Sequence, residues 1–347
     1  MFTNEKDSSY KELHEFLQTN NKCHYLQTNE WAQVKTNWQH EMITIKKDKK
    51  IVGTMSILLK KIPILNSYMM YAPRGFVCNP DDKDTLEKMT QSIKEIANKY
   101  NAFIFRMDPD IPDNNTEFKE IMKSLNYKFK TNSKTIQPKF VYRLEIKDRT
   151  NEELLKSFKS KTRYNINLAM RKNVKIKTAK RSDIPIFYSI LKYTAKRDHF
   201  HIRDIAYYEK IFDTMSPEHI RVLIAEYKNE PIATAMSVFY GDTVWYLYGG
   251  SMDKYRNYMP TYLVQYEMIK WAVDRKCKYY DFGGVSGYKS ENDPMYGVFR
   301  FKKGFNGEVV EYVDELYLVF RPHINTMYNI MSDCRSVFLK IENHLLK

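Results

Sequence analysis

The side chains that most often carry covalent or metal chemistry do not form a recognisable catalytic pattern in this sequence. Four cysteines are scattered along the chain, at Cys23, Cys78, Cys277 and Cys334. Their spacing excludes a zinc ribbon and a CxxC redox pair. His199 and His201 flank Phe200, but no nearby carboxylate or cysteine completes a metal site. We therefore predict no bound metal and interpret the two histidines as loop residues.

Positive charge is the second feature with chemical consequences. Lys and Arg exceed Asp and Glu by 14, which favours an anionic partner such as a nucleic acid, a phosphorylated metabolite or a membrane surface. An ordinary lysine-rich protein would show the same excess. Much of the charge is concentrated at Lys156, Lys159, Lys161, Arg163, Arg171, Lys172, Lys175 and Lys177. This cluster could follow phosphates or form a solvated helix face.

Length and composition indicate a folded protein of two domains. The chain has 347 residues, of which 43% are apolar and 14% aromatic, enough for a sizeable core. Scattered thiols suit a reducing compartment, and the N-terminal segment lacks the apolar core of a signal peptide. The most apolar stretch, residues 51–65, contains Lys60 and Lys61 and is too short to span a bilayer. We therefore expect a cytoplasmic protein.

An internal repeat is the most informative pattern in the chain. KKDKKIVGTMSILLK (residues 46–60) resembles YKNEPIATAMSVFYG (residues 227–241), with Met55 aligned to Met236. A further strand, a helix and another strand then follow in the same order in both halves. This order predicts two copies of one α/β unit, in which an antiparallel meander precedes a helix and a last strand.

The order of elements is that of acetyltransferase-like (GNAT-fold) domains, so we predict an α/β (α+β) protein with two such domains in tandem. Ordinary members bind the pyrophosphate of acetyl-coenzyme A with a Gly-rich turn, Q/R-x-x-G-x-G/A, at the start of the main helix. The corresponding segments, residues 77–88 and 252–263, lack that turn. Without its backbone amides the pyrophosphate loses its cradle. We therefore expect neither acetyl-coenzyme A nor another cofactor.

Flanking segments define the predicted domain limits. We expect residues 1–145 and 318–347 to form domain 1 and residues 146–317 to form domain 2. An amphipathic, basic helix is predicted over residues 151–173. The C-terminal segment should be a helix that returns to cover domain 1, with an apolar stripe at Ile324, Met327, Met331, Cys334, Phe338 and Ile341.

The sequence resembles the Fem (FemABX) family of peptidoglycan-bridge transferases in motifs spread over nearly the whole chain. In order, they are W-A-x-V-K with a following Trp (31–38), F-R-x-D-P (105–109), I-Q-P (136–138), K-x-x-x-x-I (161–166), H-x-R-x-x-x-Y-Y (201–208), W-Y-x-Y-x-G-S (245–251), Y-D-x-G-G (280–284) and F-K-x-x-F (301–305). The chain is most similar to the FemX type. Other Fem proteins carry a long helical arm, for which no residues are left after the basic helix.

The resemblance implies an aminoacyltransferase of peptidoglycan synthesis, cell-wall biogenesis and hence cell shape. Its donor would be aminoacyl-tRNA carrying Gly, Ala or Ser, and its acceptor the Lys or diaminopimelate amine of a stem peptide. The acceptor molecule would be UDP-MurNAc-pentapeptide or lipid II, with peripheral membrane association in the second case; DNA is not an expected partner. The reaction needs an aligned amine and a stabilised oxyanion, but no covalent nucleophile, because an aminoacyl ester is already activated.

By this resemblance the catalytic residues are Asp108 and Lys302. Asp108 ends the strand FIFRMD, and its carboxylate would orient the attacking ammonium and accept its proton; position alone fits a turn-capping Asp equally well. Lys302 lies in FKKGF, interpreted as a strand, and would stabilise the oxyanion or protonate the leaving hydroxyl. The alternative is a solvated lysine. Arg300 and Lys303 are close enough in sequence to hold the same role.

The resemblance also implies that domain 1 binds the precursor and that domain 2 lies on the aminoacyl-tRNA side. It implies particular binding residues as well. Lys35 and Arg203 would contact the diphosphate of the precursor, because cationic groups suit phosphate oxygens. The phenols expected in the same groove are Tyr207, Tyr246 and Tyr248, the last two on one face of a strand; the alternative is that they belong to the core. The residues expected to contact tRNA are Phe301, Lys161 and Arg163.

Two other functions compete with this interpretation. An acetyl-coenzyme A-dependent N-acetyltransferase would explain the fold, and a non-catalytic nucleic-acid-binding module would explain the charge. Neither explains the ordered motifs.

Overall fold

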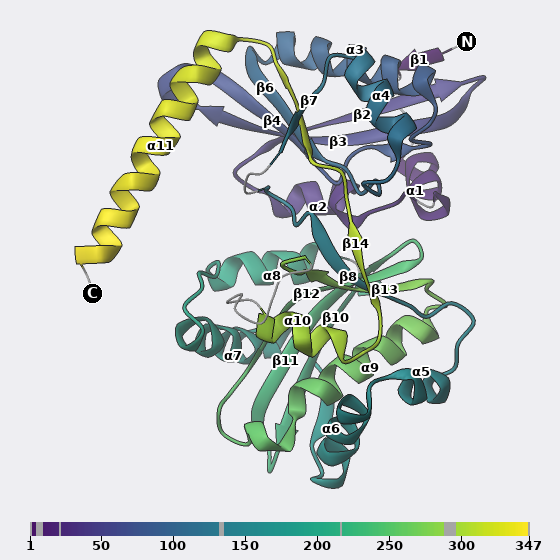
Figure 1. Cartoon of the computed structure of the whole chain (residues 1–347), viewed down its shortest axis with the longest axis vertical. Helices are drawn as coiled ribbons and strands as arrows, with labels where there is room; N and C mark the ends of the chain where they lie inside the picture. Colours follow the sequence, from purple (N-terminus) through teal and green to yellow (C-terminus); the bar gives the residue numbers. More distant parts are fainter. Residues whose placement is uncertain are drawn as a thin grey trace. The chain divides into compact units, whose positions relative to one another are not determined.

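The computed structural model describes residues 2–4, 10–20, 22–131, 135–215, 217–287 and 296–345. The chain forms two compact units, each built on one mixed sheet (Figure 1). The first unit comprises Met1–Phe16, Lys35–Ile136 and Val313–Lys347, and the second comprises Leu17–Val34 and Gln137–Tyr312.

The sheet of the first unit has the strand order β1-β2-β3-β4-β6-β15-β7, and β5 also pairs with β3. Neighbouring strands are antiparallel except β4 and β6, which are parallel. The strands are β1 (Phe2–Asn4), β2 (Gln39–Lys47), β3 (Lys50–Ile62), β4 (Ser67–Pro73), β5 (Val77–Cys78), β6 (Ala102–Asp108), β7 (Lys128–Lys130) and β15 (Glu315–Val319).

The sheet of the second unit has the strand order β14-β8-β13-β12-β11-β10-β9. Here β12 and β13 are the parallel pair, and the other pairs are antiparallel. The strands are β8 (Phe140–Glu145), β9 (Lys175–Thr178), β10 (Ile220–Tyr227), β11 (Glu230–Tyr240), β12 (Thr243–Ser251), β13 (Tyr279–Gly284) and β14 (Glu308–Glu311).

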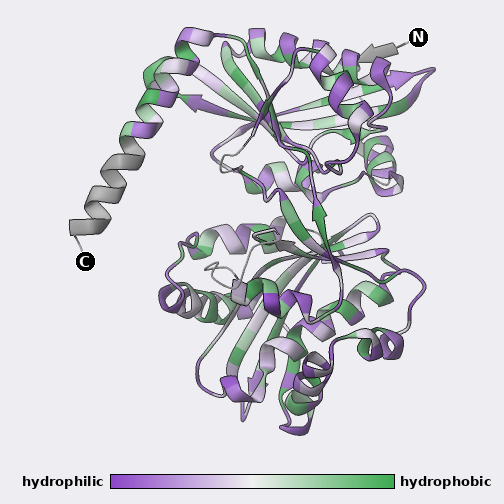
Figure 2. Ribbon diagram, in the orientation of Figure 1, coloured by the Kyte–Doolittle hydropathy of each residue, from purple (hydrophilic) through white to green (hydrophobic). Residues whose placement is uncertain are grey.

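Helices cover the sheets within each unit, and Figure 2 shows hydrophobic colour along the central strands. The α-helices are α1 (Tyr10–Thr19), α2 (Asn29–Val34), α3 (Lys83–Lys99), α4 (Thr116–Ser124), α5 (Asn151–Ser157), α6 (Ser160–Arg171), α7 (Ile184–Arg197), α8 (Ile205–Thr214), α9 (Pro260–Asp274), α10 (Tyr296–Lys303) and α11 (Pro322–Leu345). Short 3₁₀ turns are η1 (Tyr25–Gln27), η2 (Pro63–Leu65), η3 (Arg181–Asp183) and η4 (Arg256–Tyr258).

The predicted duplication is confirmed. Both units contain an antiparallel meander, a helix and a parallel strand, as β2-β3-β4-α3-β6 and β10-β11-β12-α9-β13. Even the first hairpin turn is repeated, because two left-handed residues form it in each copy. They are Asp48 and Lys49 (φ 50° and 66°) in one copy, and Lys228 and Asn229 (φ 52° and 63°) in the other. Such turns match the right-handed twist of the flanking strands.

The predicted domain limits differ from the units in three places. Strand β8 was expected in domain 1, but it pairs with β13 and β14 of the second unit. Strand β15 begins inside the range expected for domain 2, but it pairs with β6 and β7 of the first unit. The segment 17–34 lies in the second unit, where Tyr25 packs against Trp31 and Trp245 at centroid distances of 5.0 and 5.4 Å.

The basic helix expected over residues 151–173 is wrong as one helix. The chain breaks between α5 and α6 at Phe158, which has extended backbone angles and a buried ring that packs on Phe305 and Tyr266. Burial of this ring outweighs continuation of the helix. Helix α6 ends at Arg171 and β9 starts at Lys175, so no helical arm lies between them.

Helix α11 belongs to the first unit, as expected. Its Ile324 and Tyr328 pack on Phe103 of β6. The predicted stripe is wrong at Met327, which is exposed, and at Cys334, which is also exposed; Phe338 and Ile341 lie outside the described side chains. In the described part of the chain, no helix combines the length and apolarity needed to cross a membrane.

Candidate active site

Asp108 is the last residue of β6, where this strand lies beside Pro73 of the parallel strand β4. Its side chain is buried, with 3% of the residue exposed. The Tyr71 hydroxyl donates a hydrogen bond of 2.5 Å to Oδ2, whereas Oδ1 has no hydrogen-bond partner among the described residues. Burial raises the pKa of this carboxyl to about 6, although the Tyr71 hydrogen bond acts in the opposite direction. The group can therefore take up and release a proton near neutral pH.

Charged side chains surround Asp108 on the same unit. Arg106 donates two hydrogen bonds, of 2.6 and 2.7 Å, to the fully buried carboxylate of Glu315 on β15. The negative charge of Glu315 raises the pKa of Asp108, and the positive charges of Arg74 and Arg106 lower it. Sequence reasoning missed Tyr71, Arg74 and Glu315. The parallel pairing of β4 with β6 would have revealed the first, because it places the end of β4 beside the end of β6.

Lys302 lies on helix α10, so the strand predicted for FKKGF is wrong. Only 5% of the residue is exposed, and its ammonium donates a 2.8 Å hydrogen bond to the carbonyl of Gly284, the last residue of β13. Burial lowers the pKa of Lys302 to about 8, while the nearby Asp281 raises it. Arg300 and Lys303 of the same helix are exposed. These three cations are close in sequence, but the helix points them in different directions, so that Lys302 is buried and Arg300 and Lys303 are exposed.

Asp281 has fixed partners of its own. Its Oδ2 accepts hydrogen bonds of 3.2 and 3.1 Å from Nε and Nη2 of Arg143, and its Oδ1 accepts one of 2.7 Å from the Gly283 amide. The negative charge of this carboxylate raises the pKa of Lys302 and so partly offsets the effect of burial. The Y-D-x-G-G motif contained Asp281, but sequence reasoning assigned it no role.

A pocket of about 150 Å³ lies beside the C-terminal half of β12. This half begins after Trp245, the last residue of β12 that pairs with β13. Helices α7, α9 and α10 close the pocket, and it is lined by Thr194, Thr234, Tyr246, Gly249, Gly250, Ser251, Thr261, Val264, Gln265 and Phe301. Gly249 is required here, because a Cβ atom would collide with the Tyr246 hydroxyl and lie 2.9 Å from the Thr234 carbonyl. Phe301, predicted to meet the tRNA terminus, therefore lies in a pocket wall and packs on Tyr262 at 4.8 Å.

Tyr246 and Tyr248 do not share one face of β12, so that prediction is wrong. A bulge makes Tyr246 pair with Ser237 and Tyr248 with Met236, skipping Leu247. Because Ser237 and Met236 are consecutive, their partners point to opposite faces. Tyr246 accordingly lines the pocket with α9, and its burial raises its pKa to about 12.

Tyr248 instead joins Arg203 and Tyr207 on the other face. The Tyr248 and Tyr207 hydroxyls are 3.5 Å apart, and the Arg203 guanidinium lies 5.8 Å from the centre of the Tyr207 ring. Tyr208 completes the group with an edge-to-face contact of 5.1 Å to Tyr248. Burial raises the pKa of Tyr248 well above its ordinary value, which keeps its hydroxyl protonated as a donor. Three of the five predicted acceptor-binding residues are thus neighbours.

The remaining predicted binding residues have other surroundings. Lys35 is half-buried in the first unit, where its carbonyl accepts the Trp38 amide at 2.9 Å. Lys161 is exposed on α6. The Arg163 guanidinium donates to the carbonyls of Lys156 and Phe158, at 3.0 Å for the first. Arg163 therefore caps the end of α5, which is a structural role.

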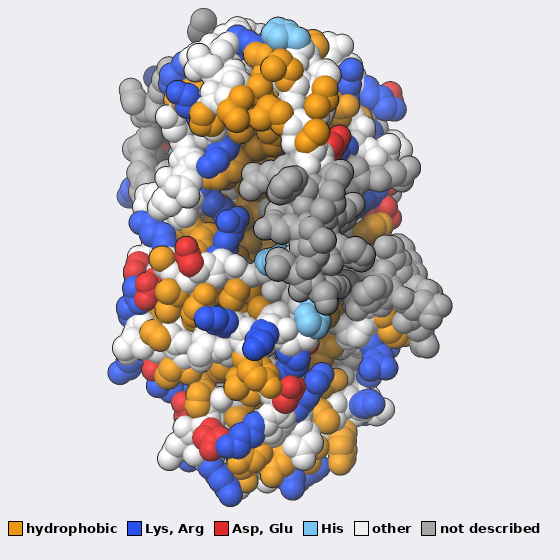
Figure 3. Space-filling model, turned by 90° about the vertical axis from the view of Figure 1, so that its left-hand side faces the viewer, with side chains coloured by type: hydrophobic (Ala, Val, Ile, Leu, Met, Phe, Trp, Pro, Cys, Tyr) orange, Lys and Arg blue, Asp and Glu red, His pale blue; other side chains and the backbone are white. Residues whose placement is uncertain are grey.

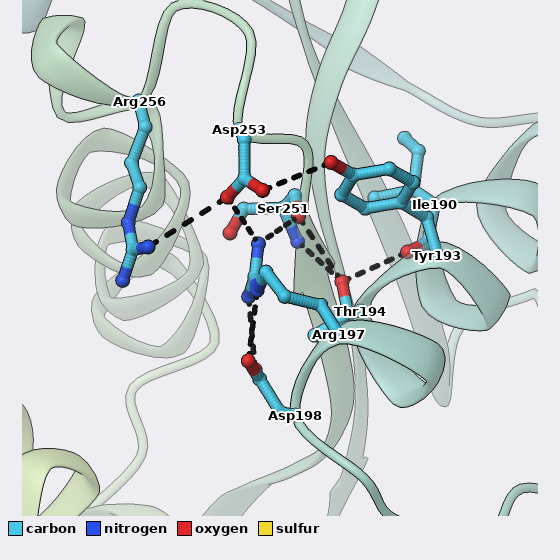
Figure 4. Close-up of polar contacts among 8 residues, drawn as sticks. All are labelled: Ile190, Tyr193, Thr194, Arg197, Asp198, Ser251, Asp253 and Arg256. Atoms are coloured by element: carbon cyan, nitrogen blue, oxygen red, sulfur yellow. Dashed lines mark hydrogen bonds and ion pairs between the residues drawn. The ribbon is translucent and has the colours of Figure 1, made fainter.

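The connection from β12 to α9 occupies the place of the pyrophosphate loop in acetyltransferases. Figure 4 shows that a polar network fastens it to α7: Arg197 donates to the Ser251 carbonyl at 2.8 Å and to Asp253 at 3.0 Å. Tyr193 donates to the other Asp253 oxygen at 2.9 Å, and Arg256 lies 3.6 Å from Asp253. The Asp253 carboxylate is thus the centre of the polar network in this connection.

Comparison with known proteins assigns the chain to a family. A family model described as the FemAB family matches residues 8–229 and 218–332. The chain belongs to the FemAB family. This confirms the family predicted from the motifs and makes the chain a transferase.

Individual FemAB relatives are similar over nearly their whole length. A lipid II:glycine glycyltransferase of Staphylococcus epidermidis is 25% identical over 401 residues, covering 95% of this chain and 96% of the relative. One of Staphylococcus aureus is 26% identical over 406 residues, with the same coverage. These alignments are longer than the chain itself, so the relatives carry residues that have no counterpart here.

Solved structures confirm the fold of this FemAB member. The crystal structure of FemX superposes with a TM-score of 0.88 at 24% identity, covering 94% of this chain and 99% of that one. A tandem GNAT protein from the clavulanic acid biosynthesis pathway superposes with a TM-score of 0.54 at 7% identity. The prediction of two acetyltransferase-like domains in tandem is therefore confirmed.

Proposed function

We propose that this chain transfers an amino acid from aminoacyl-tRNA to the stem-peptide amine of a peptidoglycan precursor, forming the first link of an interpeptide bridge. The observation that carries the proposal is that a buried ionisable group lies at the ends of two equivalent strands, one in each unit. In the first unit Asp108 is the last residue of β6. In the second, Lys302 is bonded to the last residue of β13, the strand equivalent to β6.

The two groups have complementary chemistry. With a pKa of about 6, Asp108 is mostly ionised at pH 7.5. Its Oδ1, which has no hydrogen-bond partner among the described residues, can then hold the attacking ammonium and accept its proton. With a pKa of about 8, Lys302 is mostly protonated at the same pH and can stabilise the oxyanion. The amine nitrogen then bonds to the acyl carbon and the ester bond breaks. The departing ribose hydroxyl takes a proton from Lys302, and the second proton of the attacking nitrogen returns to Lys302. The products are the amide, the free ribose hydroxyl and the proton held by Asp108.

The β12–α9 connection supports aminoacyl-tRNA rather than acetyl-coenzyme A as donor. Pro260 has no amide proton, and the amides of Arg256, Met259 and Tyr262 donate to carbonyls within the connection. These amides are therefore not free to bind a pyrophosphate, and the Asp253 carboxylate lies in the same connection. An aminoacyl ester of tRNA does not need this cradle. Such a donor is made in the cytosol, so we place the reaction in the cytoplasm.

The cluster of Arg203, Tyr207 and Tyr248 supports an acceptor with phosphate and sugar groups. A guanidinium binds phosphate oxygens in a two-pronged manner, and phenols kept protonated by burial donate to sugar or peptide oxygens. The names of the staphylococcal relatives favour lipid II as acceptor and glycine as the transferred residue. UDP-MurNAc-pentapeptide offers the same diphosphate and sugar.

A reconstitution with defined substrates tests the proposal. The purified chain is incubated with tRNA charged with Gly, Ala or Ser and with lipid II or UDP-MurNAc-pentapeptide, each carrying Lys or diaminopimelate. Mass spectrometry of the acceptor then identifies the added residue. We expect one amino-acid increment that disappears with ribonuclease treatment and is absent with Asp108→Asn.

Parallel reactions with acetyl-coenzyme A test the competing activity. An acetylated acceptor together with no transfer from charged tRNA would establish an N-acetyltransferase and refute the proposal. Binding of tRNA without modification of any acceptor would instead support the nucleic-acid-binding module.

A further inference from the structure

The hairpin between β3 and β4 ends in an apolar tip. Its turn is η2, of sequence Pro-Ile-Leu, and Ile64 at its centre is 80% exposed. No other large hydrophobic side chain of the described residues is as exposed. Solvated turns are normally polar, and an isoleucine held in water at such a tip contributes nothing to the core.

Hydrogen bonds and apolar packing nevertheless anchor the chain on both sides of the tip. Asn66, just after the turn, has a left-handed backbone (φ 43°), and its carbonyl accepts a 3.0 Å hydrogen bond from the Asn101 side chain. Ser67 donates a 2.5 Å hydrogen bond to the Asn101 carbonyl. At the base of the hairpin, Ile62 packs in a cluster with Met69 and Phe103. The fold therefore anchors the chain on both sides of the turn and leaves Ile64 exposed between them.

Basic and aromatic side chains flank the tip. Lys61 is exposed, and Lys60 donates a 3.2 Å hydrogen bond to the Asn37 carbonyl while its ammonium lies 5.9 Å from the centre of the Trp38 ring. Trp38 itself packs in the same cluster as Ile62. An apolar tip with lysines and a tryptophan behind it is the arrangement that suits the boundary between headgroups and acyl chains.

Helix α11 adds exposed apolar surface at the same end of the first unit. Its Ile324 and Tyr328 share the cluster of Ile62, whereas Met327 and Ile330 are 52% and 58% exposed. Figure 3 faces the end of this unit where α11 begins, and hydrophobic side chains gather at the top of that face with Lys and Arg beside them. The apolar tip thus belongs to a wider patch.

We propose that this end of the first unit binds the surface of an anionic bilayer, with Ile64 inserted among the acyl chains and Lys60 and Lys61 facing lipid phosphates. The lysines supply charge complementarity to such a surface, which a neutral protein partner would not require. Membrane binding itself does not depend on the proposed function. Its consequence does rest on that function, because binding would bring the enzyme to a lipid-linked acceptor.

Vesicle sedimentation tests the surface without requiring any activity. The full chain is mixed with vesicles of phosphatidylcholine alone or with 30 to 50% phosphatidylglycerol, on the order of what anionic-lipid binding needs. We expect binding only with the anionic lipid, weakened about tenfold by Ile64→Ser and by the double change Lys60→Gln and Lys61→Gln.

Matched variants separate this tip from general effects of charge and apolarity. Lys49 and Lys50 form a lysine pair at the opposite end of β3, and Ile136 is an isoleucine that is 45% exposed elsewhere in the same unit. The double change Lys49→Gln and Lys50→Gln, and Ile136→Ser, should leave binding unchanged. Equal losses in these controls would overturn the proposal, as would binding that Ile64→Ser does not affect.

A second measurement links the surface to catalysis. Ile64→Ser should lower transfer to lipid II in vesicles about tenfold and leave transfer to soluble UDP-MurNAc-pentapeptide unchanged. If no acceptor is modified at all, the proposed function fails while the vesicle result still stands. If the wild-type chain is a dimer that Ile64→Ser dissociates, and vesicles do not bind, the patch is an interface between two copies and the bilayer proposal is wrong.

Discussion

Replacement of Lys302 by methionine should severely lower turnover without destabilising the fold. Burial lowers the pKa of this lysine from its ordinary 10.5 to about 8. That difference corresponds to a cost of about 3 kcal/mol for keeping the ammonium buried at pH 7. Methionine removes this cost but leaves the Gly284 carbonyl without its donor, which costs about 1–3 kcal/mol. The free energy of unfolding should therefore stay equal or rise by up to about 2 kcal/mol.

The pH dependence of stability gives an independent check of the same charge. Between pH 8 and 10.5 the unfolded chain still binds the Lys302 proton and the folded chain does not. Lys302 therefore lowers the free energy of unfolding most below pH 8. As the pH is raised from 8 to 10.5 this loss disappears, and the free energy of unfolding rises. Urea denaturation of Lys302→Met should lack that rise.

Whereas Lys302→Met should keep or raise stability, it should lower turnover. Loss of one preorganised donor to an oxyanion typically lowers kcat about 100- to 1,000-fold, and KM should change little because the charge develops in the transition state. Arg300→Met and Lys303→Met, on the exposed side of α10, are the controls, and each should change kcat by less than about tenfold and stability by less than about 0.5 kcal/mol. A loss of more than about 1 kcal/mol in Lys302→Met, or a larger catalytic loss in either control, would refute the assignment.

The other predictions concern the first unit and the acceptor cluster. The wild-type kcat/KM should rise with pH through about 6 as Asp108 ionises. Tyr71→Phe should move that inflection to higher pH, because the Tyr71 hydrogen bond lowers the pKa of Asp108 and the variant lacks this bond; an unmoved inflection would assign it to another group. Arg203→Ala and Lys35→Ala should each raise KM for the acceptor about tenfold or more and leave KM for charged tRNA unchanged, and equal effects on both substrates would remove them from the acceptor site. Glu315→Ala should lower the free energy of unfolding by about 3 kcal/mol in urea denaturation, because it leaves Arg106 unpaired, and stability within 1 kcal/mol of wild type would contradict a buried pair.

Local sequence patterns were sufficient to predict the repeated unit and the family. A hairpin, a strand, a helix and a strand are each encoded by short-range periodicity and turn residues, and both copies retain them. The absence of a Gly-rich turn before α9 is likewise a local property. The ordered motifs then identified the FemAB family, which the family comparison confirmed.

The limits of the domains could not be predicted in this way. Each sheet takes a strand from outside its own repeat, β15 in the first unit and β8 in the second. The partner of neither strand can be predicted from its own sequence, because the hydrogen bonds that place it come from residues far away in the chain. Residues 17–34 show the same difficulty, since aromatic contacts with Trp245 decide where they belong.

The sequence by itself determined that an aspartate, Asp108, ends β6 and that a lysine, Lys302, follows β13 in the chain, and it determined the order of the elements that carry them. Only the tertiary structure decided their chemistry. Burial raises the pKa of Asp108 and lowers that of Lys302, and a bulge in β12 separates Tyr246 from Tyr248. The physical reason is that desolvation and strand register depend on what packs against a residue, and those neighbours are distant in sequence.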